Sequence, residues 1–351
     1  MCTAISYNGY AGRTLDLEYS FCEEVCVTPR GFAREYIFEG ELASKYAMVG
    51  MAYMHLGIPL YYDAVSEAGL YMAALNFPAY ARYLPRIEGK INLASAELIP
   101  YILGGARSLC EAREMLSNIN ITPDSISHDL PVTELHWHLT DGREALVIEP
   151  GINGLEISAN PHLVLTNAPN FAYHATKITE FAHISPIEST QNGKNVHPYS
   201  RGMGAIGLPG DFSSSSRFIR AAFLVKNVTE YGMIYPQIEK KESGNTNIFS
   251  QISEKLAKSG NESPQNTKSE KGKKLSAFFH ITDSLSVPYG AVLTDEGRAV
   301  YTVYTSCADL SIREYYYTTY EHRAPRSVSL TSDRIFANEV LRFSLSRGEI
   351  V

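Results

Sequence analysis

The sequence predicts an α+β fold in which antiparallel sheets are covered by a few helices. Three strand–turn–strand patterns each predict a hairpin, and hairpins join antiparallel strands. A few segments at helical spacing lie between these hairpins along the chain. Strands with helices outside them indicate layers in one domain, and they disfavour a doubly wound parallel sheet.

The first hairpin is predicted at the start of the chain, where Ala4–Tyr7 and the residues from Tyr10 onward flank Asn8-Gly9. Asn-Gly tolerates the positive φ angles of a type I′ turn, which suits a two-residue hairpin loop. The other two hairpins are predicted at 135–139 with 145–148, around Asp141-Gly142, and at 291–294 with 299–305, around Asp295-Glu296-Gly297.

Three helices are predicted between the hairpins. Ser108-Leu109-Cys110-Glu111 has the spacing of a capping box, and apolar residues follow it at helical spacing. Ser95 is predicted to cap the preceding helix, which carries Leu98, Ile99 and Ile102. The third helix is predicted after the serine run 213–216, with Phe218, Ala222 and Val225 on one face.

The charge balance favours a small-molecule partner. The chain of 351 residues has 38 acidic and 31 basic side chains, a net charge of −7, and no basic half, so a nucleic-acid partner is not expected. It shows no secretion signal, and its longest apolar stretch, 47–65, is interrupted by Gly, Pro, His and Asp. We therefore expect a cytoplasmic protein without a membrane span.

Residues 240–274 differ from the rest of the chain because they are rich in Lys, Ser and Asn and poor in apolar side chains. Such a composition buries too little surface to offset the entropy lost on ordering, which predicts a solvated surface insertion. A short amphipathic helix carrying Ile248, Phe249, Ile252 and Leu256, which could dock on a partner or a membrane, is the alternative.

Most sequence motifs of catalysis are absent, including G-x-S-x-G, H-E-x-x-H, the phosphate-binding loop and paired C-x-x-C. His136 and His138 share one face of a predicted strand, but two histidines without a third ligand are more typical of a structural role than of a metal site. Cys22 and Cys26 are predicted to be ordinary buried thiols. No metal is expected.

Cys2 is the most informative residue. Removal of Met1, which is expected when the second residue is small, leaves a thiol and a free α-amine on one residue. The thiolate is the nucleophilic form, and a free thiol with a pKa of about 8.5 is mostly protonated at neutral pH. An α-amine with a pKa of roughly 7.7–8.0 can accept that proton and later deliver it to a leaving amine. Cys2 would then supply both nucleophile and base.

Four other residues suit this chemistry. Arg13 could stabilise a thiolate and Asp16 could hold an amine, with a plain surface ion pair as the alternative. Asn76 and Asn167 each lie beside a proline-containing turn, and rigidly held amide donors suit an oxyanion. Such segments are also ordinary turns, so the residues alone leave both alternatives open.

Eight blocks of sequence carry a resemblance to known proteins. They are Met1-Cys2-Thr3-Ala4, Gly12-Arg13-Thr14-Leu15-Asp16, Leu60-Tyr61-Tyr62-Asp63, Leu75-Asn76-Phe77-Pro78, Leu135-His136-Trp137, Leu165-Thr166-Asn167-Ala168-Pro169-Asn170-Phe171, Gly207-Leu208-Pro209-Gly210-Asp211 with Ser216-Arg217-Phe218, and Tyr304-Thr305-Ser306-Cys307-Ala308-Asp309-Leu310. In this order they resemble the choloylglycine hydrolase family, which contains conjugated bile salt hydrolases and penicillin V acylases. The resemblance runs from Cys2 to about Tyr320.

The resemblance implies an N-terminal nucleophile hydrolase fold, a four-layer αββα sandwich of two antiparallel sheets between helical layers. It implies one hydrolase domain over 2–351, with the insertion at 240–274, and a homo-oligomer such as a tetramer. By the matching blocks, Cys2 corresponds to the nucleophile and Leu15 to an apolar residue of the substrate pocket. The resemblance also implies that Arg13 and Asp16 form the charged pair beside the nucleophile. It implies that Asn76 and Asn167 stabilise the oxyanion and that Arg217 completes the polar cluster. No metal or organic cofactor is implied.

The resemblance also bears on the substrate. Asn76 in Asn-Phe-Pro favours an amide of a bile acid with glycine or taurine, because the penicillin-acylase branch more often has an aromatic residue there. Penicillin V and N-acyl homoserine lactones are the alternative substrates. A binding protein that keeps the fold without catalysis is the alternative from another class. The first hairpin is a departure from the family, since it looks shortened between Ile5 and Gly12.

Overall fold

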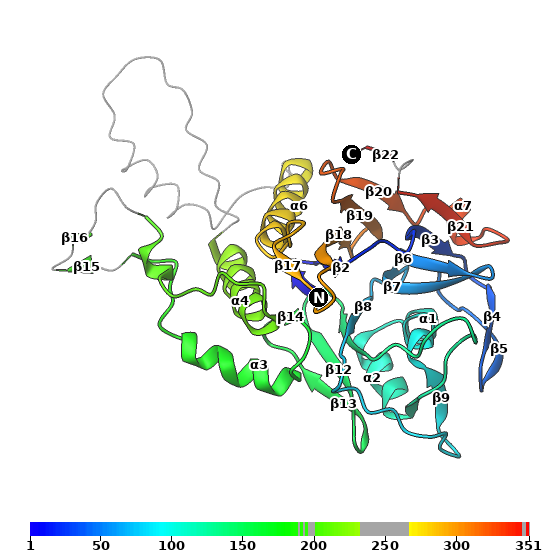
Figure 1. Ribbon diagram of the computed structural model, residues 1–351. Helices are drawn as coiled ribbons and strands as arrows, with labels where there is room; N and C mark the ends of the chain where they lie inside the picture. The colour runs from blue at the N-terminus through cyan, green and yellow to red at the C-terminus, as the bar shows by residue number, and fades with distance from the viewer. Residues whose placement is uncertain (189, 192–193, 196–200, 232–266, 346–348, 351) are drawn as a thin grey trace.

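Two eight-stranded sheets form the centre of the computed structural model (Figure 1). The structure describes residues 1–188, 190–191, 194–195, 201–231, 267–345 and 349–350. Every strand pair in the described part of these two sheets is antiparallel, as the hairpin patterns predict.

The first sheet contains both ends of the described chain and has the order β14-β1-β2-β18-β19-β20-β22, with β17 paired to β18. Its strands are β1 (Cys2–Tyr7), β2 (Tyr10–Leu17), β14 (Val164–Leu165), β17 (Val292–Leu293), β18 (Ala299–Asp309), β19 (Glu314–Thr319), β20 (Arg326–Ser329) and β22 (Glu349–Ile350).

The second sheet has the order β13-β12-β11-β8-β7-β6-β3-β21. Its strands are β3 (Glu24–Thr28), β6 (Met48–His55), β7 (Ile58–Ser66), β8 (Tyr71–Asn76), β11 (Leu135–Thr140), β12 (Ala145–Gly151), β13 (Gly154–Ala159) and β21 (Leu341–Ser344). Short two-stranded pairs lie outside both sheets: β4 (Ala33–Tyr36) with β5 (Gly40–Ala43), β9 (Ile91–Ala94) with β10 (Ile119–Thr122), and β15 (Thr190–Gln191) with β16 (Lys194–Asn195).

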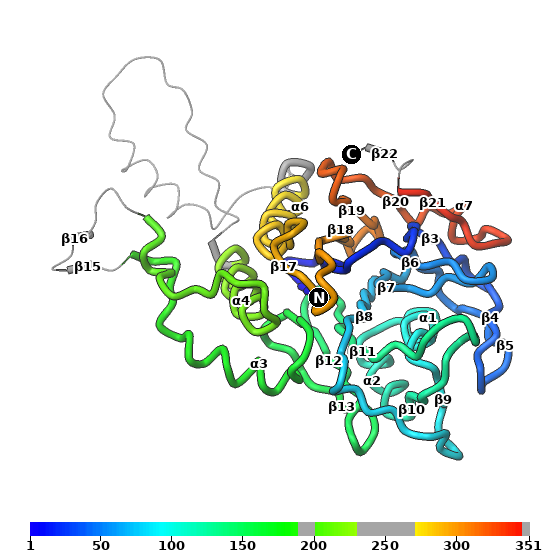
Figure 2. The backbone as a smooth tube through the Cα atoms, in the orientation of Figure 1, coloured from blue at the N-terminus to red at the C-terminus, as the bar shows by residue number. Residues whose placement is uncertain are grey.

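Helices cover the sheets on their outer faces (Figure 2). The second sheet carries α1 and α2, and the first carries α4 and α6. The helices are α1 (Leu98–Gly105), α2 (Leu109–Ser117), α3 (Phe171–Lys177), α4 (Ser214–Tyr231), α6 (Thr267–Asp283) and α7 (Ser332–Ile335), with 3₁₀ turns at Ser95–Glu97, Ile178–Phe181 and Met203–Ala205. The arrangement is the four-layer α+β sandwich that the resemblance implies.

The predicted hairpins are confirmed. Asn8 and Gly9 both have positive φ, 47° and 83°, as a type I′ turn requires. The second hairpin joins β11 to β12, and the third joins β17 to β18, although β17 is only two residues long.

One helix start is as predicted, and a second lies within a few residues of its predicted position. The Ser108 side chain accepts a hydrogen bond from the Glu111 N–H at 3.2 Å, and α4 begins inside the serine run with Phe218 and Val225 buried. The prediction for Ser95 is wrong. Its hydroxyl donates to the Thr133 carbonyl instead, and the 3₁₀ turn before α1 is closed by the Glu97 carboxylate, which accepts from the Ala94 N–H at 2.8 Å.

Two apolar cores lie on the two sides of the second sheet. One fills the space between the sheets and continues under α4 and α6. The other lies beneath α1 and α2 and contains the single tryptophan, Trp137. The second sheet is thus covered by apolar side chains on both faces, which explains why nearly every residue of β8 and β12 is buried.

The described end of the predicted insertion is helical. Residues 240–266, with the predicted amphipathic helix, lie outside the described residues. The last part, 267–274, belongs to α6, where Lys271 forms an ion pair with Glu314 of β19 at 3.1 Å. The packing of α6 on α4 and β18 orders this lysine-rich turn, and composition carries no signal of such packing.

Candidate active site

Cys2 is the first residue of β1 and is 1 % exposed. It pairs directly with Leu15 of β2, and Arg13 lies two residues before Leu15 on the same strand. Because side chains alternate along a strand and directly opposed pairs share a face, Cys2, Leu15 and Arg13 all face the second sheet. The chain therefore places the thiol between the two sheets.

Asn167 holds the main chain of Cys2. Its Oδ1 accepts from the Cys2 N–H at 2.7 Å, and its Nδ2 donates to the Asn76 carbonyl oxygen at 2.8 Å. Asn167 follows β14, which pairs with β1, and this pairing brings a residue 165 positions away along the chain to Cys2. Asn76 is the last residue of β8, in the other sheet. No hydrogen-bond partner is seen for its side-chain amide among the described residues.

Arg217 reaches the same point from the helical layer. It lies in α4 and is completely buried. Its Nη1 donates to the Cys2 carbonyl oxygen and to Thr3 Oγ1, and its Nη2 donates to Asn167 Oδ1 at 2.8 Å. Burial lowers the pKa of the Arg217 guanidinium, while the nearby Asp16 and Cys2 oppose this shift. One guanidinium thus fixes the positions of Cys2 and Asn167 relative to each other.

Arg13 lies on the thiol side of β2. Its Nη1 donates to the carbonyl oxygens of Ala74 and Tyr62, whereas its buried Nη2 has no hydrogen-bond partner in the described part of the protein. Burial by itself lowers the pKa of this guanidinium, but Cys2, Tyr304 and Asp63 raise it above its ordinary value. An unpaired cationic N–H group in this position can bind a thiolate or a substrate atom.

Asp63 lies near Arg13, and burial raises the pKa of its carboxyl group while the charge of Arg13 opposes this shift. It is fully buried, and its oxygens accept hydrogen bonds from Tyr304 at 2.7 Å and from Ser306 at 2.8 Å. Two further tyrosines donate to the same carboxylate. Ser306 in turn accepts from the Arg13 N–H at 3.1 Å.

Gly12 permits this approach of β18 to β2. A Cβ atom at this position would overlap the carbonyl oxygen of Ser306. Glycine at position 12 therefore lets Ser306 lie against Arg13.

Asp16 faces away from the thiol. Its Oδ1 accepts from Thr302 Oγ1 at 2.6 Å and its Oδ2 accepts from Thr14 Oγ1 at 3.2 Å. Its carbonyl oxygen, rather than its carboxylate, accepts from the Met1 amine at 2.6 Å. The alternative of a surface ion pair between Arg13 and Asp16 is wrong, because both are buried and they lie on opposite faces of β2.

A cavity of about 560 Å³ opens beside the thiol face of β2. Arg13, Leu15 and Asn76 line its inner part, and Tyr19 and Phe21 are the exposed aromatic residues of its lining. Trp137 contributes from β11. Such a volume, with mostly apolar walls and a few polar groups, is typical of a site for a small organic ligand.

The structure thus brings five of the six polar or nucleophilic candidates to one place by hydrogen bonds or a shared face: Cys2, Arg13, Asn76, Asn167 and Arg217. Asp16 joins them through its main chain. Sequence reasoning missed Thr3, Asp63 and Ser306, and also Ser214, whose hydroxyl lies 2.8 Å from the Asn167 carbonyl oxygen, although each lies in or beside a recognised block. Their partners are far away in sequence, so no local pattern could identify them.

His136 and His138 are both completely buried, and each has its own partner. His138 Nε2 lies 2.8 Å from Ser6 Oγ, and the ring nitrogens of His136 contact Glu149 and the Thr166 carbonyl oxygen. No group of three or more potential metal ligands occurs in the described ranges.

Burial lowers the pKa of His138 to about 3. The unfolded chain binds this proton near pH 6.5 and the folded chain does not, so folding should lose stability as the pH falls from 6.5 toward 3. Between pH 7 and pH 5, the free energy of unfolding should therefore fall by about 2 kcal/mol less in His138→Phe than in the parent. Urea unfolding at both pH values measures this difference, and equal losses in the two proteins would contradict it.

The prediction of two buried thiols is half right. Cys26 is buried on β3, but Cys22 is exposed with a φ of 62°. All five cysteines are free thiols. Among the described helices, none is both long enough and apolar enough to span a membrane.

The comparisons with known proteins agree with this arrangement. The family model described as linear amide C–N hydrolases, choloylglycine hydrolase family, matches residues 2–260 and 257–343. The crystal structure of the C2A mutant of the conjugated bile acid hydrolase from Clostridium perfringens superposes with a TM-score of 0.80 at 29 % identity, over 98 % of this chain and 96 % of that one. Together, fold and match define a linear amide C–N hydrolase with the N-terminal nucleophile hydrolase fold.

Curated relatives extend over nearly the whole chain. A bile salt hydrolase/transferase from Lactiplantibacillus plantarum is 36 % identical, over 98 % of this chain and 97 % of that protein. The chain belongs to the choloylglycine hydrolase family. A penicillin V acylase from Agrobacterium tumefaciens shares the fold, with a TM-score of 0.69 at 20 % identity, over 98 % of this chain and 91 % of that one.

Proposed function

We propose that this enzyme is a conjugated bile salt hydrolase that cleaves the amide between a bile acid and glycine or taurine, with Cys2 as the nucleophile. The observation that carries the proposal is the position of Cys2. Asn167 and Arg217 hold its main chain, and its side chain shares a face with Leu15 and Arg13, two residues that line an apolar cavity. The relatives that are named bile salt hydrolases support the choice of substrate.

Before the enzyme can act, removal of Met1 converts the Cys2 nitrogen from a peptide nitrogen into an amine. This amine takes the thiol proton, and the thiolate attacks the amide carbonyl carbon. The resulting oxyanion accepts hydrogen bonds from the side-chain amides of Asn167 and Asn76. The ammonium group then protonates the departing glycine or taurine nitrogen as the C–N bond breaks, which leaves an acyl-thioester on Cys2. Water attacks the thioester, gives its proton to the amine, and releases the bile acid.

The charged groups have separate roles in this proposal. Arg13 stabilises the thiolate from the cavity side through its unpaired Nη2. Arg217 fixes the main chain at the nucleophile through the Cys2 carbonyl oxygen, whereas the contact of the Asp16 carbonyl oxygen with Met1 is lost when Met1 is removed. Every step uses groups of this chain and water.

Loss of Met1 is the first test of this mechanism. Intact-mass analysis of the active protein should show a chain that begins at Cys2, because only a free α-amine can accept the thiol proton. Edman sequencing provides a second measurement of the same terminus. Full activity in a preparation that wholly retains Met1 would contradict the mechanism.

Leu15 tests the cavity. It is 3 % exposed and lines the space next to Cys2, so Leu15→Ala should remove apolar contact with the substrate. We expect KM for taurocholate to rise by about 10-fold with little change in kcat. Leu146→Ala is the matched control, because Leu146 is equally buried but does not line the cavity. Equal KM values in the two variants would show that the substrate binds elsewhere.

A substrate panel separates the proposal from its alternatives. Taurocholate, glycocholate, penicillin V and an N-acyl homoserine lactone are offered to the purified protein, and kcat/KM is compared. Asn76 in Asn-Phe-Pro favours the two bile salts, because the penicillin-acylase branch of the family more often has an aromatic residue there. A higher kcat/KM for penicillin V or for the lactone would overturn the bile salt assignment, and no turnover of any amide would favour the non-catalytic alternative.

We also propose a cytoplasmic location and a homo-oligomer such as a tetramer, both on the basis of the resemblance. Light scattering of the purified protein measures the second property directly.

A further inference from the structure

The Asn167 segment has no regular backbone pairing of its own. It runs from the end of β14 at Leu165 to the start of α3 at Phe171, so side chains must fix its position. On the helical side, Ser214 Oγ lies 2.8 Å from the Asn167 carbonyl oxygen and accepts from the Asn167 N–H at 3.0 Å. His174 Nε2 lies 2.9 Å from the same carbonyl oxygen.

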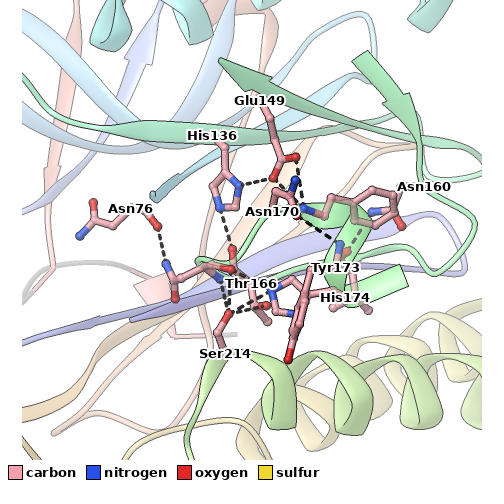
Figure 3. A network of polar contacts seen from close by, with 12 residues as sticks. Asn76, His136, Glu149, Asn160, Thr166, Asn170, Tyr173, His174 and Ser214 are labelled. Carbon is pink, nitrogen blue, oxygen red and sulfur yellow. Dashed lines mark hydrogen bonds and ion pairs between the residues drawn. The ribbon is translucent and has the colours of Figure 1, made fainter. Parts of the chain in front are cut away.

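On the opposite side, two residues of the second sheet hold both ends of this segment (Figure 3). His136 Nε2 donates to the Thr166 carbonyl oxygen at 2.7 Å. Its Nδ1 lies 3.1 Å from Glu149 Oε1, and the Glu149 carboxylate accepts from the Phe171 N–H at 2.9 Å. The two side chains come from the neighbouring strands β11 and β12 and are buried.

The atoms in contact determine where the hydrogens lie. A carbonyl oxygen only accepts, so His136 Nε2 must carry a hydrogen. A second hydrogen lies between His136 Nδ1 and the Glu149 carboxyl group, and the contact is a hydrogen bond whether the nitrogen or the oxygen carries that hydrogen. The ring also stacks on Phe77, with the ring centroids 4.2 Å apart and the planes 8° from parallel. The imidazole thus has a fixed orientation.

We infer that His136 and Glu149 are positioning residues for Asn167. They hold the peptide before Asn167 and the first N–H group of α3, and thereby set where the Asn167 amide meets the oxyanion. This inference rests on the proposed function, in which Asn167 donates to that oxyanion. A displacement of about 1 Å at such a donor can cost about 100-fold in rate, so the supporting pair should affect turnover although it touches no substrate.

His136→Phe is the central test. Phenylalanine keeps a planar ring for stacking on Phe77 and removes the donor to Thr166. We expect kcat for the preferred bile salt to fall by roughly 10- to 100-fold, with KM within a few-fold of the parent value. The rate at which iodoacetamide alkylates Cys2 should change little, because alkylation of a thiol needs no oxyanion donor.

His138→Phe is the matched control. His138 lies two residues further along β11 on the same face and is equally buried, but its partner is Ser6 rather than the Asn167 segment. The melting temperatures of both variants should fall by similar amounts. When kcat is divided by the fraction of Cys2 that iodoacetamide can alkylate, only His136→Phe should show a decrease. Equal kcat values in the two variants would overturn the inference.

Two changes at Glu149 separate positioning from charge. In Glu149→Gln the amide nitrogen can donate to His136 Nδ1 while the amide oxygen still accepts from the Phe171 N–H, so kcat should stay within a few-fold of the parent. Glu149→Ala removes both contacts and should resemble His136→Phe. A large loss of kcat in Glu149→Gln together with normal kcat in Glu149→Ala would contradict the inference.

Crystal structures of the parent and of His136→Phe give a readout that does not depend on turnover. We expect the Asn167 side chain to be displaced or to adopt several conformations in the variant. An unchanged Asn167 overturns the positioning inference even if bile salts are good substrates. If Asn167 is displaced in the variant but the parent hydrolyses no bile salt, only the proposed function is overturned.

Discussion

Replacement of Cys2 by serine should lower turnover by several orders of magnitude while binding of bile salts persists. A hydroxyl group is a much weaker acid than a thiol, so an α-amine cannot generate a useful fraction of the alkoxide at neutral pH. The cavity walls at Leu15 and Asn76 are unchanged by this substitution, and they account for the expected binding. Stopped-flow or radiometric assays of taurocholate hydrolysis measure turnover, and calorimetric titration of the variant measures affinity.

Two exposed cysteines provide matched controls. Cys22→Ser and Cys110→Ser make the same chemical change at residues with no α-amine of their own, and both variants should keep the activity of the parent. A substrate-like inhibitor should label Cys2 alone. Near-parent turnover in Cys2→Ser, or labelling of Cys22, would refute the thiol–amine mechanism.

Asn167→Ala should lower kcat by about 10²- to 10³-fold, which corresponds to roughly 3–4 kcal/mol of lost transition-state stabilisation. An oxyanion donor acts mainly as charge develops, so KM should change much less than kcat. The substitution also removes the acceptor for the Cys2 N–H and for Arg217 Nη2. Part of the loss could therefore come from a shifted nucleophile.

Asn167→Asp separates these two effects. Aspartate keeps an oxygen for the Cys2 N–H and for Arg217, but it replaces the Nδ2 donor with an acceptor. We expect kcat to fall at least as far as in the alanine variant, while iodoacetamide alkylates Cys2 at a rate close to that of the parent. Parent-like turnover in Asn167→Asp would show that Asn167 does not donate to the oxyanion.

Local sequence was sufficient for the parts of the fold that depend on neighbouring residues. Asn8-Gly9 predicted the first hairpin, and Ser108 predicted the start of α2, because turn dihedrals and helix caps are determined within a few residues. Ser95 shows where this argument fails. Its hydroxyl found a better acceptor at Thr133, 38 positions away, and no local rule includes that competitor.

The identities of the candidate site residues could also be predicted, but their arrangement could not. The motif around Cys2 and the ordered blocks indicated which side chains matter. The side of β2 on which each lies follows from register, and register places the Asp16 carboxylate on the face opposite the thiol.

The reactive groups could be identified from the residues alone: a thiol that can share its residue with an amine, two arginines and two amides. How these groups meet depends on the packing of the two sheets and the helices. β14 pairs with β1, α4 packs over β1, and the ends of β8 and β11 face them from the second sheet. The contacts of Asn167 with Cys2, Arg217 and Asn76 each close a loop of about 50 residues or more. Such contacts form because burial of the two sheet faces stabilises one common packing, and that free energy belongs to the whole fold rather than to any local pattern of residues.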